Sequence, residues 1–174
     1  MTGERAEIAR IHRGIKGVPG AQSSGAALVS FNAPAFESYG KEQSYNAPVG
    51  MYGEFAYTTA LNYLLSDRTY SLQIGDTMVV FWAESAETDY QAVFMGCMDS
   101  PTDNQEELKS LFERIRLGQP VIYQGNELDP EQRFYVLGLA PNAARLSVRF
   151  FYENSFGNTL KNISAHYKRM ELIR

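Results

Sequence analysis

The chain has 174 residues, of which 44% are apolar and 13% aromatic, so it can bury a core and is not disordered by composition. No apolar run approaches the length of a membrane span, and a single cysteine, Cys97, excludes an internal disulfide or a Cys-rich zinc site. The first residues lack the apolar core of a signal peptide, so the simplest expectation is a reducing, cytoplasmic setting.

The net charge of −4 argues against a nucleic-acid binder, but the charge is unevenly distributed. Residues 51–130 carry a net −9, whereas residues 1–50 carry +1 and residues 131–174 carry +4. An uneven field can present a local basic patch on an acidic protein. The alternative is that the basic C-terminal part is an ordinary solvated helix face.

The N-terminal part is dominated by a glycine-rich stretch, residues 15–48. Residues 7–12 alternate weakly and predict a strand leading into it, and residues 27–31 predict a short apolar strand between two loops. The loops carry small and amide side chains, bracketed by Lys16 and Lys41. Such a mix suits contact with a polar polymer backbone. The alternative is that these are irregular loops that cap a sheet.

A helix is predicted to begin after Asn46, which suits an N-cap, with Pro48 in the first turn. One face of this helix would be largely aromatic, and we expect that face in the core rather than as a base-stacking platform. Its residues are Tyr52, Phe55, Ala56, Thr59, Ala60 and Tyr63.

The middle of the chain predicts a hairpin and two helices. Residues 70–74 alternate, Gly75 and Asp76 form a turn, and residues 78–83 return as an apolar strand that should be central or covered on both faces. Two helical stripes follow: Tyr90, Val93, Phe94 and Cys97, and then Leu108, Leu111, Phe112 and Ile115, the second capped by Asn104 and Glu107. Residues 119–130 predict an exposed connection with a short strand at 121–123.

The C-terminal part predicts a hairpin and a last helix. Its strands are residues 134–139 and 145–152, joined by a turn at Pro141 and Asn142. The alternation places Val148 inward and Arg149 on the opposite face. Ser155 is the predicted cap of the helix, whose core face is Leu160, Ile163, Tyr167 and Met170. Arg145 and Arg149 can pair with phosphates or with the acidic middle segment.

These elements predict an α+β fold, with a mixed or antiparallel sheet from two hairpins and three to four packed helices. We expect a loop, helix and hairpin unit over residues 1–100 and a helix, hairpin and helix unit over 101–174, forming one compact domain.

The sequence predicts no catalytic residues, no metal site and no cofactor. His12 and His166 lack a second ligand at metal spacing, although His12 can help hold a phosphate beside Arg13 and Lys16. Asp76, Glu84 and Asp89 lack the nearby lysine of a two-carboxylate nuclease. The glycines of residues 14–25 are not followed by the Gly-Lys-Ser/Thr of a nucleotide-binding loop.

Two long runs of sequence resemble the large subunit of the type I-C CRISPR Cascade complex, the Csd family. The first comprises Gly20-Ala-Gln-Ser-Ser-Gly25, Leu28-Val-Ser-Phe-Asn32, Ser38-Tyr-Gly-Lys-Glu-Gln43 and Asn46-Ala-Pro-Val49. The second comprises residues 134–145 and Ser147-Val-Arg-Phe150. The resemblance covers nearly the whole chain. Because members of this family are much longer, the chain is similar to an internal part of them.

The resemblance implies a non-enzymatic, cytoplasmic part of an RNA-guided surveillance complex. Its partners would be double-stranded target DNA, other Cascade subunits with the guide RNA, and a helicase-nuclease recruited in trans, and its tasks would include reading the flanking motif, or PAM. It implies no membrane. The residues expected to contact DNA are Lys16, Gln22, Ser23, Ser24, Asn32, Lys41, Gln43, Asn46, Asn142, Arg145 and Arg149.

Two alternatives stay open at the level of sequence. The chain can be an assembly scaffold that docks on the backbone subunits of the complex without reading DNA directly. Setting the resemblance aside, it can be a small metal-dependent hydrolase.

Overall fold

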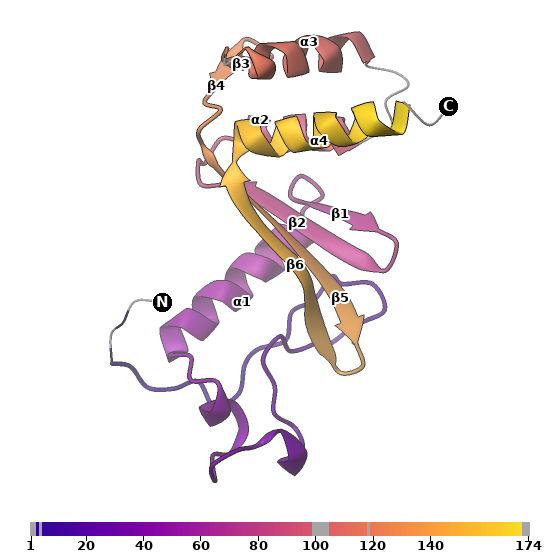
Figure 1. Ribbon diagram of the computed structural model, residues 1–174. Coiled ribbons are helices and arrows are strands. Elements are labelled where there is room, and N and C mark those ends of the chain that lie inside the picture. Colours follow the sequence, from indigo (N-terminus) through magenta and orange to yellow (C-terminus); the bar gives the residue numbers. More distant parts are fainter. Residues whose placement is uncertain (1–2, 4, 99–104, 118, 172–174) are drawn as a thin grey trace. The chain divides into compact units, whose positions relative to one another are not determined.

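A computed structural model describes residues 3, 5–98, 105–117 and 119–171 (Figure 1). Two short 3-10 helices, Pro34–Phe36 and Gln43–Asn46, precede the regular elements. These are α1 (Met51–Ser66), β1 (Ser71–Ile74), β2 (Thr77–Ala83), α2 (Asp89–Met98), α3 (Gln105–Arg116), β3 (Val121–Tyr123), β4 (Asn126–Leu128), β5 (Arg133–Asn142), β6 (Arg145–Ser155) and α4 (Phe156–Glu171). Four strands form an antiparallel sheet in the order β1-β2-β5-β6, so the predicted α+β fold is confirmed.

The chain divides into two units. The first comprises residues 1–80 and 137–150, and the second comprises residues 81–136 and 151–174. The first unit contains the glycine-rich stretch, α1 and the tip of the β5–β6 hairpin. The second contains α2, α3, α4 and the small hairpin of β3 and β4. All the residues that we expected to contact DNA belong to the first unit.

The first predicted hairpin is confirmed. β1 and β2 pair in antiparallel register from Ser71↔Val80 to Ile74↔Thr77, around the turn at Gly75 and Asp76. β2 is an inner strand of the sheet and buries Val79, Val80 and Phe81, as its apolar sequence predicted. The outer end of β1 is less covered than its alternation suggested, because Ile74 is exposed beside the turn.

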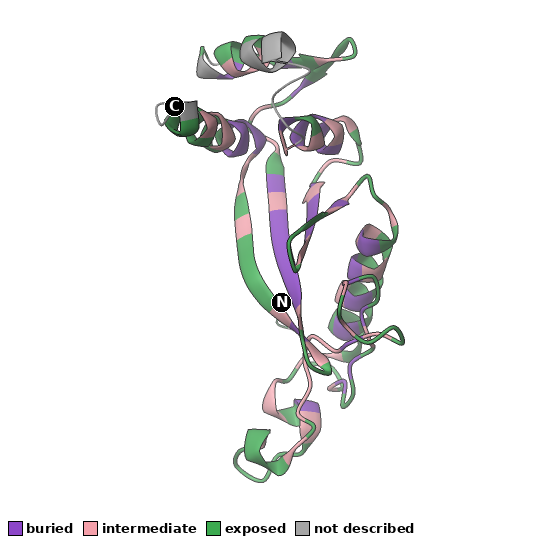
Figure 2. Cartoon of the chain, turned by 90° about the vertical axis from the view of Figure 1, so that its right-hand side faces the viewer, coloured by how far each residue is buried: buried purple, intermediate pink, exposed green. Residues whose placement is uncertain are grey.

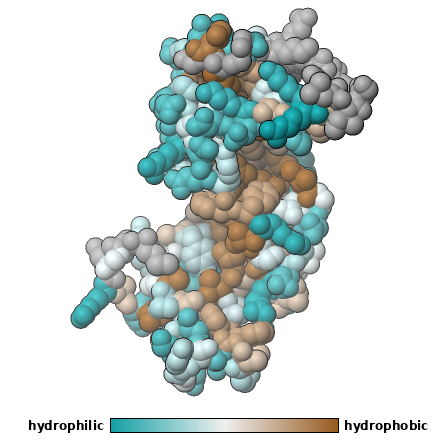
Figure 3. All heavy atoms as spheres, viewed as in Figure 1, coloured by the Kyte–Doolittle hydropathy of each residue, from teal (hydrophilic) through white to brown (hydrophobic). Residues whose placement is uncertain are grey.

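The second hairpin is also confirmed, with two corrections. Pro141 and Asn142 belong to β5, and the turn lies at Ala143 and Ala144. Val148 is not inward, since its side chain is 50% exposed. Figure 2 shows β5 largely buried and β6 largely exposed, and Figure 3 shows apolar surface over these strands. Alternation identifies residues that share a face, but both faces of the edge strand β6 are exposed from Val148 to Phe151, whereas Leu146, on the same face as Val148, is buried.

The second unit has an aromatic core. The ring of Phe134, from β5, lies 5.1 Å from that of Phe94 in α2 and 5.3 Å from that of Phe156 in α4, between ring centroids. Phe81 lies 4.7 Å from Phe94. The predicted buried stripe of α2 is confirmed, because Tyr90, Val93, Phe94 and Cys97 are all buried.

The ends of the second unit differ in part from the expectations. The Ser155 hydroxyl accepts a hydrogen bond from the Asn158 amide at 3.4 Å, as a cap does, but Met170 is 47% exposed rather than in the core.

Residues 119–130 contain the β3–β4 hairpin, which buries Val121 and Leu128, so this region is not merely an exposed connection. Asn104, the predicted cap, lies outside the described residues, and so do the side chains of Glu107 and Leu108.

Helix α1 differs most from expectation. It begins at Met51 with Gly50 as N-cap, whereas Asn46 ends a 3-10 helix. The buried face is Glu54, Thr58, Leu61 and Leu65, and the aromatic face expected in the core is exposed, with Tyr52 at 74%. Hydropathy is nearly uniform around this helix, so periodicity alone did not identify the buried face. The choice depends on the polar partners of Glu54, described below.

The two N-terminal strands that we predicted are not formed. Residues 7–12 make a single bridge, Ile8↔Gly50, and residues 27–31 make only the parallel bridge Ala27↔Arg145. None of the described helices combines the length and the apolarity that a membrane crossing requires.

Candidate nucleic-acid interface

The glycine-rich stretch is held on α1 by hydrogen bonds to polar side chains. The Arg13 amide donates to Glu54 Oε1 at 2.7 Å, and the Lys16 amide donates to Asn62 Oδ1 at 2.8 Å. Asn62 Nδ2 in turn donates to the Gly14 carbonyl at 3.2 Å. Glu54 is almost fully buried, and the Arg13 amide gives its carboxylate a hydrogen-bond partner there. Helix α1 therefore fixes the path of the segment that carries Lys16.

His12 belongs to this anchor, which corrects the expectation that it holds a phosphate. Its side chain is 5% exposed, and Nδ1 lies 2.5 Å from the Tyr57 hydroxyl. Burial lowers the pKa of His12, against a smaller opposing effect of Glu54. Burial, and then Glu54, raise the pKa of Tyr57 to about 12. A buried imidazole that favours its neutral form does not serve as a phosphate ligand at the surface.

Gly14 and Gly25 bring two parts of the segment into direct backbone contact. Ile15 and Ala26 exchange two hydrogen bonds of 2.9 Å beside them. A Cβ atom on Gly14 would lie 2.9 Å from the carbonyl carbon of Gly25, and Gly25 has a φ of +110°. Only glycine fits both conditions. This closure presents residues 16–24 as a loop, on which Lys16, Gln22, Ser23 and Ser24 are exposed.

In a second loop, residues 32–46, two amide side chains are already hydrogen-bonded within the chain. Asn46 accepts from the Ser38 amide at 2.8 Å and donates to the carbonyls of Lys41 and Gln43 at 2.7 and 2.9 Å. The Gln43 side chain accepts from Arg10 Nε at 2.7 Å. The Asn46 side chain thus shapes the loop and the Gln43 side chain ties it to Arg10, while Asn32 and Lys41 are exposed on it.

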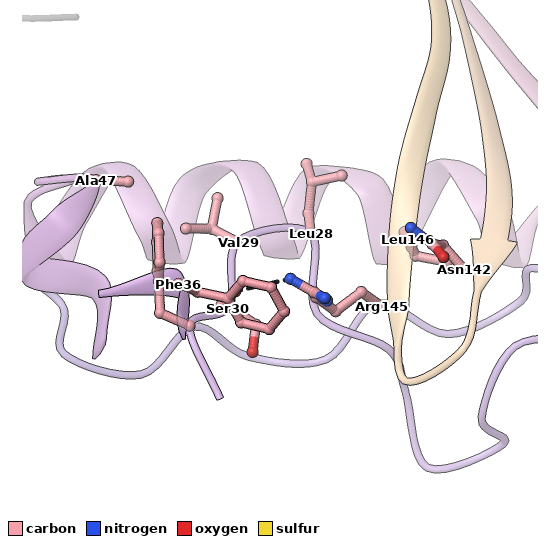
Figure 4. A pocket seen from close by; sticks show the side chains of 9 residues that line it. Leu28, Val29, Ser30, Phe36, Ala47, Asn142, Arg145 and Leu146 are labelled. Carbon is pink, nitrogen blue, oxygen red and sulfur yellow. Dashed lines mark hydrogen bonds between the residues drawn. The ribbon is translucent and has the colours of Figure 1, made fainter. Parts of the chain in front are cut away.

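The start of β6 meets the glycine-rich segment and brings Arg145 to Phe36. The Leu146 amide donates to the Ala27 carbonyl at 3.0 Å, which places Arg145 beside residues 27–30. The Arg145 guanidinium lies 4.5 Å from the centre of the Phe36 ring and donates to the Ser30 carbonyl at 3.4 Å (Figure 4). The ring attracts the cation through its quadrupole and holds the guanidinium plane in one place.

A pocket of about 500 Å³ opens around this pair. It is open to solvent, and its lining combines apolar side chains with the polar groups of Ser30, Asn142 and Arg145. Arg145 is partly buried and forms no ion pair with any residue that the structure describes. A partly desolvated cation without a counter-ion is costly, so the pocket favours an anionic or electron-rich ligand. The apolar walls are formed by Leu28, Val29, Phe31, Phe36, Ala47 and Leu146.

The predicted DNA-contacting residues are only partly brought together. Asn142 and Arg145 share the pocket, whereas Lys16, Lys41 and the exposed loop residues do not line it. Arg149 forms an ion pair with Asp76 at 3.2 Å, so it uses the alternative of pairing with the acidic middle segment. That pair is exposed on both sides, so it contributes little to stability.

Sequence reasoning missed Phe36, which completes the pocket. The residue lies in an exposed 3-10 turn, more than 100 residues before Arg145. The available signal was a large aromatic side chain in a run of small and polar residues, where no periodicity gives it a place in a core.

The described residues contain no group of three or more His, Cys, Asp or Glu side chains that could hold a metal ion. Cys97 is buried, and burial raises the pKa of its thiol to about 12, so the thiolate is scarce at neutral pH.

The family model described as CRISPR-associated protein, Cas_Csd1, matches residues 1–174. No curated protein matches the chain.

Proposed function

Because the chain belongs to the Csd1 family of CRISPR-associated proteins, we propose that it contributes to binding of double-stranded target DNA in a type I-C Cascade complex. The observation that carries this proposal is the Arg145 guanidinium, partly buried on Phe36 and without a carboxylate partner in the described part of the chain. A DNA phosphate supplies the missing anion.

The exposed loop residues extend this contact. Lys16 and Lys41 are exposed cations, and each would neutralise a phosphate without reading sequence. Gln22 and Asn32 have exposed amides that can read base edges of the flanking motif, together with Ser23, Ser24 and Asn142. Asn46 and Gln43 support the Lys41 loop, and Arg149 contributes only when it leaves Asp76.

The test is a salt titration of target binding by the assembled complex. Lys16→Ala and Arg145→Ala should each lower affinity about equally for all flanking sequences and reduce the salt slope by roughly 0.9. Lys161→Ala, an exposed lysine on α4 in the second unit, is the matched control and should leave the slope unchanged. An unchanged slope in folded Lys16→Ala and Arg145→Ala complexes would overturn DNA contact through this surface.

Recognition of the flanking DNA motif is tested separately, through the amide side chains. Gln22→Ala or Asn32→Ala should change which flanking motif is accepted, by about 1–3 kcal/mol for a good bidentate contact. Equal losses for all motifs would assign both amides to backbone contact. We propose that base pairing with the guide reads the rest of the target, and that the complex then recruits the helicase-nuclease in trans.

We propose that the chain itself has no catalytic activity and acts in the cytoplasm. Plasmid DNA incubated with the purified chain and Mg²⁺ or Mn²⁺ should remain intact. Cleavage that survives repurification and is lost in Asp76→Asn or Glu84→Gln would support a metal-dependent hydrolase instead.

A second role, assembly scaffold, is favoured by the exposed face of α1. Tyr52, Phe55 and Tyr63 lie exposed on a helix whose single charged residue, Glu54, is buried. The Arg13 guanidinium lies 5.1 Å from the centre of the Phe55 ring, and aromatic and arginine side chains are enriched in protein interfaces. Tyr52→Ser with Tyr63→Ser should then weaken incorporation into the complex without changing the salt slope of DNA binding. Unaltered incorporation would remove this role from α1.

A further inference from the structure

We infer that the pocket around Phe36 and Arg145 takes a single unpaired nucleobase, and not only a phosphate. This inference rests on the proposed DNA-binding function. It concerns a different part of the ligand, since a base is planar and largely apolar, whereas a phosphate needs only charge and hydrogen-bond donors.

The lining of the pocket carries the first step. A backbone phosphate needs charge and hydrogen-bond donors but no apolar surface. This open pocket of about 500 Å³ is lined by apolar side chains, such as Leu28 and Leu146, together with Ser30, Asn142 and Arg145. Such a combination of apolar and polar groups suits a small, flat organic ligand.

The pair of Phe36 and Arg145 carries the second step. Unpaired bases stack on aromatic rings and on guanidinium planes, and here both surfaces are already held against each other, 4.5 Å from cation to ring centre. The Ser30 carbonyl holds the guanidinium in place through a hydrogen bond of 3.4 Å (Figure 4). The stacking surface is thus formed before a ligand arrives.

The polar groups carry the third step. Asn142 has an exposed amide at the end of β5 and lines the pocket beside Leu146 (Figure 4). A side-chain amide offers both a donor and an acceptor, which suits the edge of a base once its pairing partner is gone. The pocket is also fixed to regular structure, because the Leu146 amide donates to the Ala27 carbonyl at 3.0 Å.

A base that enters the pocket must have left its stack, so the site favours DNA whose duplex is already open at one position. The experiment uses the assembled complex and two target duplexes, one fully paired and one with a single unpaired nucleotide, moved stepwise through and beside the flanking motif. At one position the unpaired nucleotide should raise affinity by about five-fold to a hundred-fold, the range of base stacking on an aromatic side chain.

Two variants test the pocket itself. Phe36→Leu keeps apolar volume but removes the ring, and Leu28→Trp fills the pocket from another wall. Each should abolish the gain from the unpaired nucleotide, so that the ratio of the affinities for the two duplexes falls to about one, whether or not the affinity for the paired duplex also declines. Tyr39→Leu is the matched control, because Tyr39 is an aromatic residue of the same segment, 98% exposed and not part of the pocket lining.

The outcomes separate this inference from the proposed function. An unchanged ratio of the two affinities in Phe36→Leu and Leu28→Trp would leave a phosphate contact and overturn the base site. Loss of complex assembly, with unchanged DNA binding by the assembled fraction, would assign the pocket to a partner's side chain and also overturn it. If the unpaired nucleotide raises the affinity at no position, the base site is overturned as well. If neither duplex binds, the proposed function itself fails. Should Phe36→Leu fail to fold, as judged by its thermal melt, Leu28→Trp decides.

Discussion

The polar anchor around Glu54 in the first unit and the aromatic core around Phe134 in the second are stabilised by different interactions. Glu54 binds the Arg13 amide at 2.7 Å and lies beside the pair of His12 and Tyr57. Phe134 is surrounded by other rings and has no exposed surface. An aromatic core tolerates some choice of side chain, whereas a polar anchor depends on single donors and acceptors. The glycine-rich segment therefore keeps its path through a few specific hydrogen bonds.

The largest expected effect is in the aromatic core. Phe134→Ala should lower the free energy of unfolding by about 3–5 kcal/mol, because it removes a fully buried ring and leaves a cavity. Phe151→Ala is the matched control, since Phe151 is more than half exposed on β6. Denaturant unfolding followed by circular dichroism measures both. Similar losses for the two variants would show that this core does not dominate the stability of the second unit.

The polar anchor should give a smaller effect that depends on the chemistry of the replacement. Glu54→Ala leaves the Arg13 amide without its acceptor and should cost about 1–3 kcal/mol. Glu54→Gln keeps an oxygen acceptor at the same place and should cost less. If denaturant unfolding shows Gln to be as damaging as Ala, the carboxylate charge matters more than the hydrogen bond.

The anchor should also respond to pH through His12. Burial holds the pKa of His12 below the ordinary 6.5, so an unfolded chain binds this proton more readily than the folded one. The contribution of His12 to stability is therefore complete above the unfolded pKa and is lost as the pH falls below about 6.5. Thermal melts from pH 7.5 to 5 should show a steeper decline for the wild type than for His12→Gln, which cannot titrate. Parallel declines would place the acid sensitivity in other groups.

The smallest effects are expected on β6. Val148→Asp should cost less than about 1 kcal/mol, because the side chain is half exposed and a carboxylate there stays hydrated. Arg149→Ala breaks only an exposed ion pair with Asp76 and should change the free energy of unfolding by less than about 0.5 kcal/mol. A loss of several kcal/mol in the Val148→Asp melt would show that something covers this face.

Sequence patterns predicted the elements that bury apolar surface at a regular spacing. Both hairpins of the large sheet and the buried stripe of α2 follow from periods of 2 and 3.6 residues. The buried face of α1 did not follow, because hydropathy penalises Glu54 and favours Tyr52, although Glu54 has a partner in Arg13. The identity of that partner, 41 residues earlier in the chain, is a tertiary fact.

The candidate site was predicted in its charges but not in its shape. Arg145 and Asn142 could be selected from residue type beside a turn, and both line the pocket. Their apolar counterpart Phe36 comes from an irregular turn, where local sequence does not determine the long-range contact. Arg149, like Arg145, is an arginine on β6, but it pairs with Asp76 instead of lining the pocket. That pairing depends on the turn between β1 and β2, which carries Asp76.

The backbone contact between Gly14 and Gly25 has a consequence for screens of random substitutions. Each glycine would place a new Cβ within about 3 Å of the other's backbone, so a change at one position cannot be relieved by shrinking the other, which already lacks a side chain. In a saturation library scored for folding, both positions should accept only glycine, and a second substitution at one of them should not rescue a substitution at the other. Gly3, Gly40 and Gly125 have open space around the added atom, so their remaining constraint is a positive φ, which asparagine and aspartate tolerate best. Such a library would thus separate glycines required for backbone contact from glycines required only for a turn.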